Sequence, residues 1–75
     1  MSKLPVVSGR ETVKALSKTG FTVVGRKGSH VRLKRQRGKE VLIVIVPMHD
    51  ELARGTLKSI LRQANLTVDD FLRLL

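Results

Sequence analysis

The sequence contains no cysteine, tryptophan or tyrosine, and its only aromatic residues are Phe21 and Phe71. The absence of cysteine excludes a disulfide scaffold, a thiol nucleophile and any zinc site built on thiolates. Because aromatic rings are so scarce, the hydrophobic core is expected to be aliphatic. Acidic residues are also few: six Asp and Glu stand against 15 Lys and Arg, which leaves a net charge of +9.

Long hydrophobic runs are absent as well. No stretch approaches the roughly 20 apolar residues that a membrane span requires. The N-terminal segment, residues 1–10, lacks the apolar run of a signal peptide. We therefore expect a cytoplasmic protein without a membrane partner. A chain of 75 residues can form one small domain, and we expect residues 1–75 to do so.

The positive charge is concentrated in the middle of the chain. Seven Lys or Arg residues lie between Arg26 and Lys39, and no acid interrupts them. A large net charge repels itself, so it usually serves an anionic partner. The basic run has strand-like alternation rather than the pattern of an amphipathic helix, which argues against an anionic membrane surface. Nucleic acid is the partner that best explains this charge.

The N-terminal half predicts one helix followed by a β-meander. Ser8 and Glu11 have the spacing of a capping box, and Gly20 is a stop signal, which predicts a helix over residues 9–19. Strands are predicted over residues 21–24, 30–34 and 41–46, with turns at 25–28 and 37–39 and with Pro47 ending the third strand.

The C-terminal third predicts two further helices. A helix beginning at Gly55 or Thr56 has an apolar stripe of Leu57, Ile60, Leu61 and Ala64, with Asn65 as its C-cap. Thr67 is the expected N-cap of a short last helix. The predicted fold class is α+β. It is a two-layer α-β-β-β-α fold of the double-stranded-RNA-binding-domain type, in which helices cover one face of a three-stranded antiparallel sheet.

Alternation along the second strand predicts which side chains are exposed. If Val31 and Leu33 face the helices, then His30, Arg32 and Lys34 project from the opposite face. On the second helix a basic ridge lies opposite the apolar stripe, formed by Arg54, Lys58 and Arg62. Either basic surface can hold phosphates.

The third strand, Val41–Val46, is apolar on both of its faces. In a meander this strand lies at an edge, where an exposed apolar strand promotes aggregation. We therefore expect its outer face to be covered. The candidate occupants are a second copy of the chain, a different protein, or the terminal helix or N-terminal arm of the same chain.

The two histidines suggest chemistry on RNA. A ribose 2′-OH can attack the adjacent phosphorus while one group removes its proton and another protonates the leaving oxygen, and histidine suits either task. Cations stabilise the charge that develops on the phosphorus, and Lys27, Arg32 and Lys34 lie near His30 in sequence. Neither His30 nor His49 belongs to a metal-ligand motif. The same residues also fit a surface that binds RNA without cutting it.

Several segments, in this order, resemble the HicA toxins, also described as YcfA-like proteins. They are Leu4–Gly9, Gly28-Ser29-His30, Pro47-Met48-His49, Arg54–Leu57, Ile60–Ala64 and Thr67–Phe71. The resemblance implies a double-stranded-RNA-binding-like fold. It also implies the toxin component of a type II toxin–antitoxin system, an endoribonuclease that cleaves mRNA and arrests translation and growth.

The resemblance also implies roles for individual residues. His30 corresponds to the family's catalytic histidine, and His49 is a candidate second acid or base. The expected RNA-binding residues are Arg26, Lys27, Ser29, Arg32, Lys34, Arg54 and Lys58. No metal or other cofactor is expected. A HicB-type antitoxin is expected to mask His30, and either it or a second HicA chain would cover Val41–Val46. The alternatives are a non-catalytic RNA-binding module and a subunit whose charge matches an acidic protein.

Overall fold

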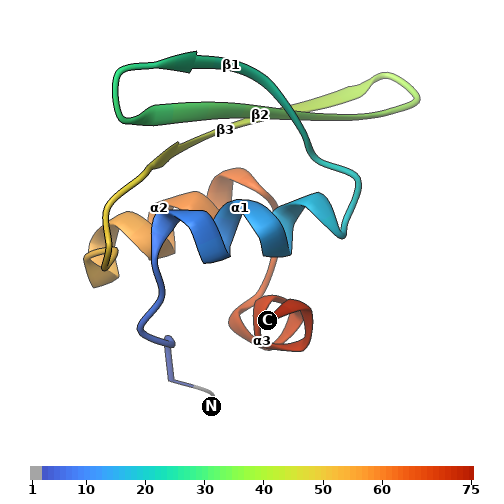
Figure 1. Ribbon diagram of the computed structural model, residues 1–75. Helices are drawn as coiled ribbons and strands as arrows, with labels where there is room; N and C mark the ends of the chain where they lie inside the picture. Colours follow the sequence, from blue (N-terminus) through green and yellow to red (C-terminus); the bar gives the residue numbers. More distant parts are fainter. Residues whose placement is uncertain (1–2) are drawn as a thin grey trace.

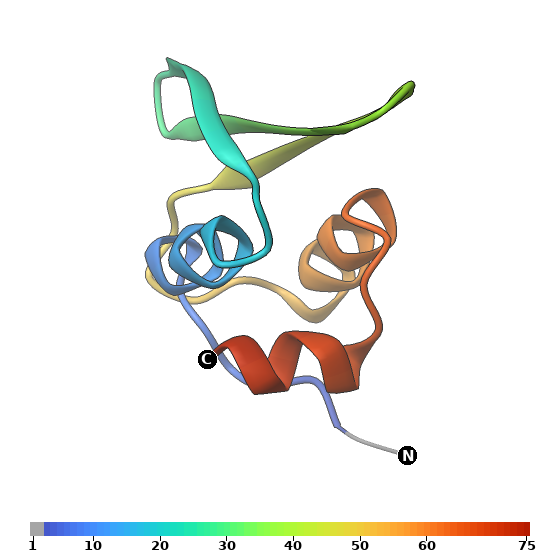
Figure 2. The same cartoon turned by 90° about the vertical axis from the view of Figure 1, so that its right-hand side faces the viewer.

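The computed structural model describes residues 3–75. Its elements are α1 (Gly9–Ser17), β1 (Thr22–Lys27), β2 (His30–Arg37), β3 (Glu40–Pro47), α2 (Arg54–Gln63) and α3 (Val68–Leu74). The strands form an antiparallel sheet in the order β1-β2-β3. Helices α1 and α2 lie side by side against one face of the sheet, and α3 crosses beneath them (Figures 1 and 2). This α+β, double-stranded-RNA-binding-domain-like arrangement confirms the predicted fold class.

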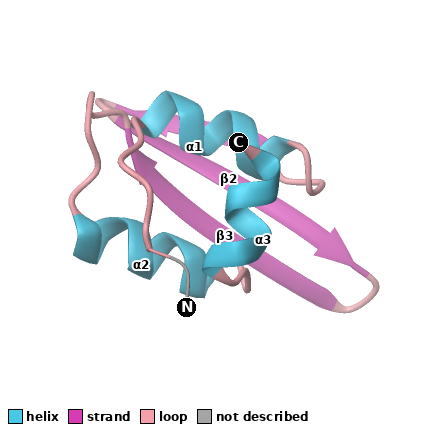
Figure 3. Ribbon diagram, turned by 90° about the horizontal axis from the view of Figure 1, so that it is seen from below, coloured by secondary structure: helices cyan, strands magenta, loops and turns pink. Residues whose placement is uncertain are grey.

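The core lies between the sheet and the two helices, where β2, β3, α1 and α2 all contribute apolar side chains. The predicted stripe on α2 is buried throughout. Val31 and Leu33 of β2 also face this core, as alternation predicts. From the α3 side, Phe71 closes the core with no exposed surface, whereas Leu72 and Leu75 stay partly exposed. Figure 3 shows this side, with α3 lying across both longer helices.

Side-chain caps fix the starts of α1 and α3. The Ser8 hydroxyl accepts a hydrogen bond from the Glu11 backbone N–H at 3.0 Å, and the Glu11 carboxylate accepts one from the Ser8 N–H at 3.0 Å. These bonds satisfy N–H groups that the first turn leaves without intrahelical partners. Both predicted N-caps, Ser8 and Thr67, are therefore confirmed.

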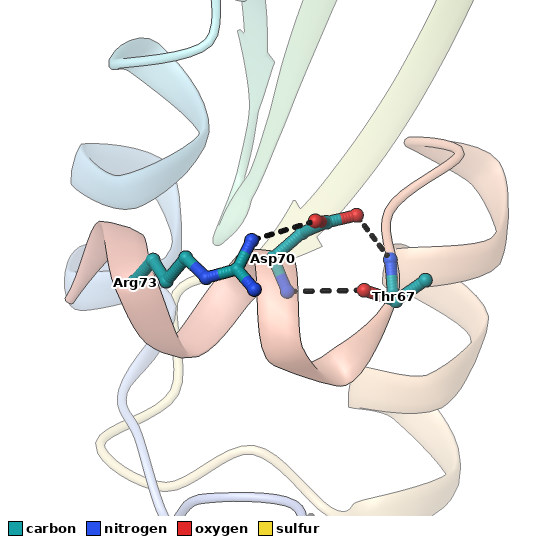
Figure 4. A network of polar contacts seen from close by, with 3 residues as sticks. All are labelled: Thr67, Asp70 and Arg73. Carbon is teal, nitrogen blue, oxygen red and sulfur yellow. Dashed lines mark hydrogen bonds and ion pairs between the residues drawn. The ribbon is translucent and has the colours of Figure 1, made fainter.

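At α3 the capping box joins Thr67 and Asp70, as Figure 4 shows. The hydrogen bond from the Thr67 backbone N–H holds the pKa of the Asp70 carboxyl below its ordinary value. The Thr67 hydroxyl and, more weakly, the Arg73 guanidinium 3.6 Å away lower this pKa further. The box fixes the first turn of α3, the helix that carries Phe71 into the core.

Several predicted boundaries are wrong by a few residues. Residues 25–27, expected in a turn, continue β1, and only Gly28 and Ser29 form the connection to β2. A β-bulge between Val23 and Gly25 carries the strand past this glycine. The first helix ends at Ser17 rather than Thr19. Asn65 follows the cap residue Ala64 of α2 in the left-handed region, with φ +58°.

No described part of the chain covers the outer face of β3. Val41, Ile43 and Ile45 project from the side of the sheet away from the helices, and their exposed fractions are 44–46%. Helix α3 packs below α1, on the far side of the helical layer (Figure 2). The N-terminal arm pairs with the loop after β3, where the Leu52 N–H donates to the Val7 carbonyl. The alternative in which the chain covers its own apolar strand is therefore wrong for residues 3–75.

Candidate functional site

The sheet face turned away from the helices carries the predicted basic residues in cross-strand rows. His30 pairs with Lys27 on β1 and with Pro47 on β3. The next row on this face joins Gly25, Arg32 and Ile45, and the following one joins Thr22, Lys34 and Ile43. Because directly opposed residues share a face, imidazole, ammonium and guanidinium groups project on one side of the sheet. His30 and Arg32 are exposed, whereas Lys34 is half-buried.

A hollow of about 690 Å³ opens on this face. Its lining comes from the end of β1, the β1–β2 turn, the start of β2 and one residue of β3. The lining residues are Gly25, Arg26, Lys27, Gly28, Ser29, His30, Arg32 and Ile45. The structure therefore brings together the predicted catalytic residue His30 and four of the seven predicted RNA-binding residues.

Two members of this lining, Gly25 and Ile45, were not identified from the sequence. An isolated glycine inside a strand pattern is a signal for a bulge or a close approach, but the run of residues 25–28 predicts a turn at Gly25. Ile45 belongs to an apolar run in which nothing marks one residue as part of a site. Cross-strand register alone places it beside Arg32.

The turn that presents His30 is held in place by the segment after β3. Gly28 adopts φ +59°, a conformation that favours glycine. The Ser29 carbonyl accepts a hydrogen bond of 2.6 Å from the Met48 N–H. At the same place the His49 carbonyl accepts one of 2.9 Å from the N–H of Gly9, the first residue of α1. Pro47-Met48-His49 therefore ties the start of α1 to the His30 turn through backbone contacts.

His49, the candidate second acid or base, is exposed but does not line the hollow. The structure gives its backbone carbonyl a partner in Gly9. The Pro47–His49 segment therefore holds the fold together through its backbone, while the His49 imidazole lies outside the hollow.

The charge run between Arg26 and Lys39 is not one continuous surface. Arg26 pairs with Val31, a residue of the helix-facing row, although it still contributes to the hollow. Arg35 is turned inward with only 8% exposure, and its guanidinium lies 5.0 Å from the centre of the Phe21 ring. Such a cation–π contact accommodates a cation against an otherwise apolar core. Arg35 is thus removed from any RNA-binding surface.

The two predicted RNA-binding residues on α2 lie apart from the hollow. Arg54 and Lys58 are exposed on a helix that packs against the opposite face of the sheet (Figure 1). They form a second basic region, and any RNA that touches both regions must pass around the edge of the molecule.

The hollow has the groups needed for acid–base chemistry on a phosphodiester. His30 offers an exposed imidazole, and Lys27 and Arg32 place cations in its own row and the next. Such cations stabilise negative charge that develops on phosphorus. Within residues 3–75, no cluster of three or more His, Asp or Glu side chains is arranged to hold a metal ion. No helix in this range has both the length and the apolar character to cross a membrane.

Comparison with known proteins identifies one family. A family model described as "HicA toxin of bacterial toxin-antitoxin" matches residues 9–66, which include the entire hollow and helices α1 and α2. A search of curated proteins gave no match.

Proposed function

Because the chain belongs to the HicA toxin family of bacterial toxin–antitoxin systems, we propose that it is a toxin that acts as a metal-independent endoribonuclease on mRNA. The observation that carries this proposal is the position of His30. It is exposed within a hollow whose other charged residues, Arg26, Lys27 and Arg32, are all cations. Cleavage of mRNA in the cytoplasm would stop translation and growth.

In the proposed reaction the ribose 2′-OH attacks the neighbouring phosphorus, the P–O5′ bond breaks, and a 2′,3′-cyclic phosphate forms. His30 takes the proton from the 2′-OH or gives one to the leaving 5′ oxygen. Lys27 and Arg32 stabilise the added charge on the phosphoryl oxygens. His49 remains a candidate for the second acid or base. To contact it, the RNA would have to extend beyond the hollow.

The remaining predicted residues are proposed to bind the RNA backbone. Ser29 lines the hollow in the β1–β2 turn, and Lys34 lies farther along β2 on the same face of the sheet. Arg54 and Lys58 provide the second basic region on α2. Contacts of this kind are electrostatic and independent of sequence, so binding should weaken steeply as salt rises.

The direct test is cleavage by the purified chain. We expect a labelled RNA to be cut in buffer containing EDTA, with products that end in a cyclic or 3′ phosphate when analysed by gel and mass spectrometry. An RNA carrying 2′-O-methyl groups throughout should remain intact, since it cannot supply the attacking hydroxyl. Cleavage that requires an added divalent cation would contradict the proposed mechanism.

A non-catalytic RNA-binding module is the second candidate, since it needs the same basic face but not the imidazole. It predicts salt-sensitive binding with no product on the gel under any of these conditions. The cleavage assay therefore separates the two candidates directly.

Membership of a toxin–antitoxin family implies a cognate antitoxin. We propose that this antitoxin occupies the outer face of the sheet. Val41, Ile43 and Ile45 are exposed there, on the same face as His30, and Ile45 itself lines the hollow. A protein that covers these apolar side chains therefore also blocks access to the imidazole. A second copy of the chain is the alternative occupant.

Ile43→Asp should separate antitoxin binding from RNA cleavage. Ile43 is on the outer face but does not line the hollow, and a buried unpaired carboxylate is costly in an apolar interface. We expect antitoxin affinity, measured by calorimetry, to fall at least about tenfold while cleavage persists. Leu72→Asp on α3 is the control, and it should bind as the wild type does. Equal binding by both variants would place the antitoxin elsewhere. A wild-type dimer that Ile43→Asp dissociates would favour the second copy.

A further inference from the structure

Gly25 is a glycine that the fold does not require. It lies within β1, directly opposite Arg32, next to a bulge at Val24. In a G1 bulge glycine is needed for its positive φ, but the described residues with positive φ are Gly20, Gly28, Gly38 and Asn65, and Gly25 is not among them. A Cβ built on Gly25 would meet no atom within 4 Å. Neither backbone conformation nor packing therefore explains the missing side chain.

A glycine in mid-strand also weakens the strand, since it has no side chain to pack and gains more conformational freedom on unfolding. In strands such a residue often marks a place where a ligand approaches the backbone. The missing side chain at Gly25 opens the hollow on the β1 side of Arg32.

The chemistry around this opening differs from one side to the other. Across the row of Gly25, Arg32 and Ile45, the ends are uncharged: one has no side chain and the other is aliphatic. The adjoining row carries Lys27 and His30, which suit a phosphate. A planar cation beside an uncharged floor suits a nucleobase, because bases in RNA complexes stack on guanidinium planes as they do on aromatic rings.

Stacking on this face cannot come from a phenyl ring, because Phe21 and Phe71 are both buried in the core. Apart from the imidazole of His30, the guanidinium of Arg32 is the planar side chain nearest the opening in register. The occupant of the opening must therefore rely on Arg32 and on the exposed strand backbone at Gly25.

We propose that the opening at Gly25 receives one nucleobase of the RNA, stacked against Arg32, and that the base thereby places its own phosphate beside Lys27 and His30. Gly25 is then a positioning residue for the substrate, whose side chain is absent so that the base can enter. This inference rests on the proposed action on RNA and adds where the nucleotide next to the cut bond is held.

The test fills the opening without disturbing the fold. Gly25→Val introduces a β-branched residue into a strand, at a position with free space, so the midpoint of thermal unfolding should stay the same or rise. RNA binding should fall, because stacking one base strengthens binding by roughly 5- to 150-fold. We expect Gly25→Val to bind a short 2′-O-methyl oligoribonucleotide about tenfold more weakly and to cleave RNA at least as much more slowly. Gly25→Ala should show a smaller loss in both.

Gln36→Val is the matched control. It places the same side chain on the same sheet face, in the row of Val41 and outside the hollow. This variant should bind and cleave RNA as the wild type does. If Gly25→Val binds and cleaves like the control, the base-binding role of Gly25 is overturned while the ribonuclease proposal stands. If the wild type binds the oligonucleotide and Gly25→Val does not, but neither cuts RNA, the inference stands as a binding site and the ribonuclease proposal fails.

Discussion

His30→Ala is expected to lower the rate of RNA cleavage at least about 100-fold, because a positioned general acid or base contributes roughly 10²–10⁴-fold to a reaction. Induced expression of this variant should no longer arrest growth or deplete mRNA. RNA binding should change little, since Lys27 and Arg32 remain in the hollow. The fold should also be retained, because the His30 side chain is exposed and the substitution leaves the backbone pairing of this position with Lys27 and Pro47 intact.

His49→Ala provides the comparison for this experiment. Its imidazole is exposed outside the hollow, so we expect a much smaller loss of cleavage than at His30. A loss as large as that of His30→Ala would instead identify the two imidazoles as a pair acting on one phosphate. Cleavage by His30→Ala at the wild-type rate would exclude a catalytic role for the residue, and the RNA-binding alternative would then account for the basic face.

Gly9→Ala is expected to destabilise the protein by about 1–3 kcal/mol, the range observed for overpacked positions. A Cβ on Gly9 would overlap the Pro47 carbonyl oxygen and lie 2.8 Å from the Met48 Cα. Both obstacles are backbone, so no change of rotamer relieves the clash. The start of α1 would have to move away from the end of β3, which would break the hydrogen bond from the Gly9 N–H to His49.

Helix propensity acts in the opposite direction, because alanine in place of glycine favours a helix by up to about 1 kcal/mol. Gly55→Ala, in the first turn of α2, isolates this term, since its new Cβ would meet no atom within 4 Å. We expect Gly55→Ala to be neutral or slightly stabilising in urea unfolding, and Gly9→Ala to lower the midpoint. Equal midpoints for the two variants would show that α1 does not press against the Pro47–His49 segment.

The Gly9 experiment also bears on the site. Met48 holds the Ser29 carbonyl, and Ser29 directly precedes His30. Displacing the segment should therefore slow cleavage as well as lower stability.

Local signals in the sequence were sufficient to predict the order of the elements and which side chains of β2 face the core. The capping boxes at Ser8 and Thr67 depend on residues three apart, and the apolar stripe of α2 depends on residues three and four apart. Alternation along β2 placed Val31 and Leu33 inside and His30 and Arg32 outside. Each of these patterns is complete within one element, so no knowledge of the fold was needed to interpret it.

Only the tertiary structure decided how the hollow is built. Residues 25–28 have the composition of a turn. Gly25 nevertheless pairs with Arg32, so it belongs to β1 and leaves an opening there. Arg35 belongs by sequence to the basic run, yet packing against Phe21 removes it from the surface. Pro47-Met48-His49 gains its role from contacts with Gly9 and Ser29, far away in the chain. These features depend on cross-strand register and on which elements meet, and a pattern within a single segment contains neither.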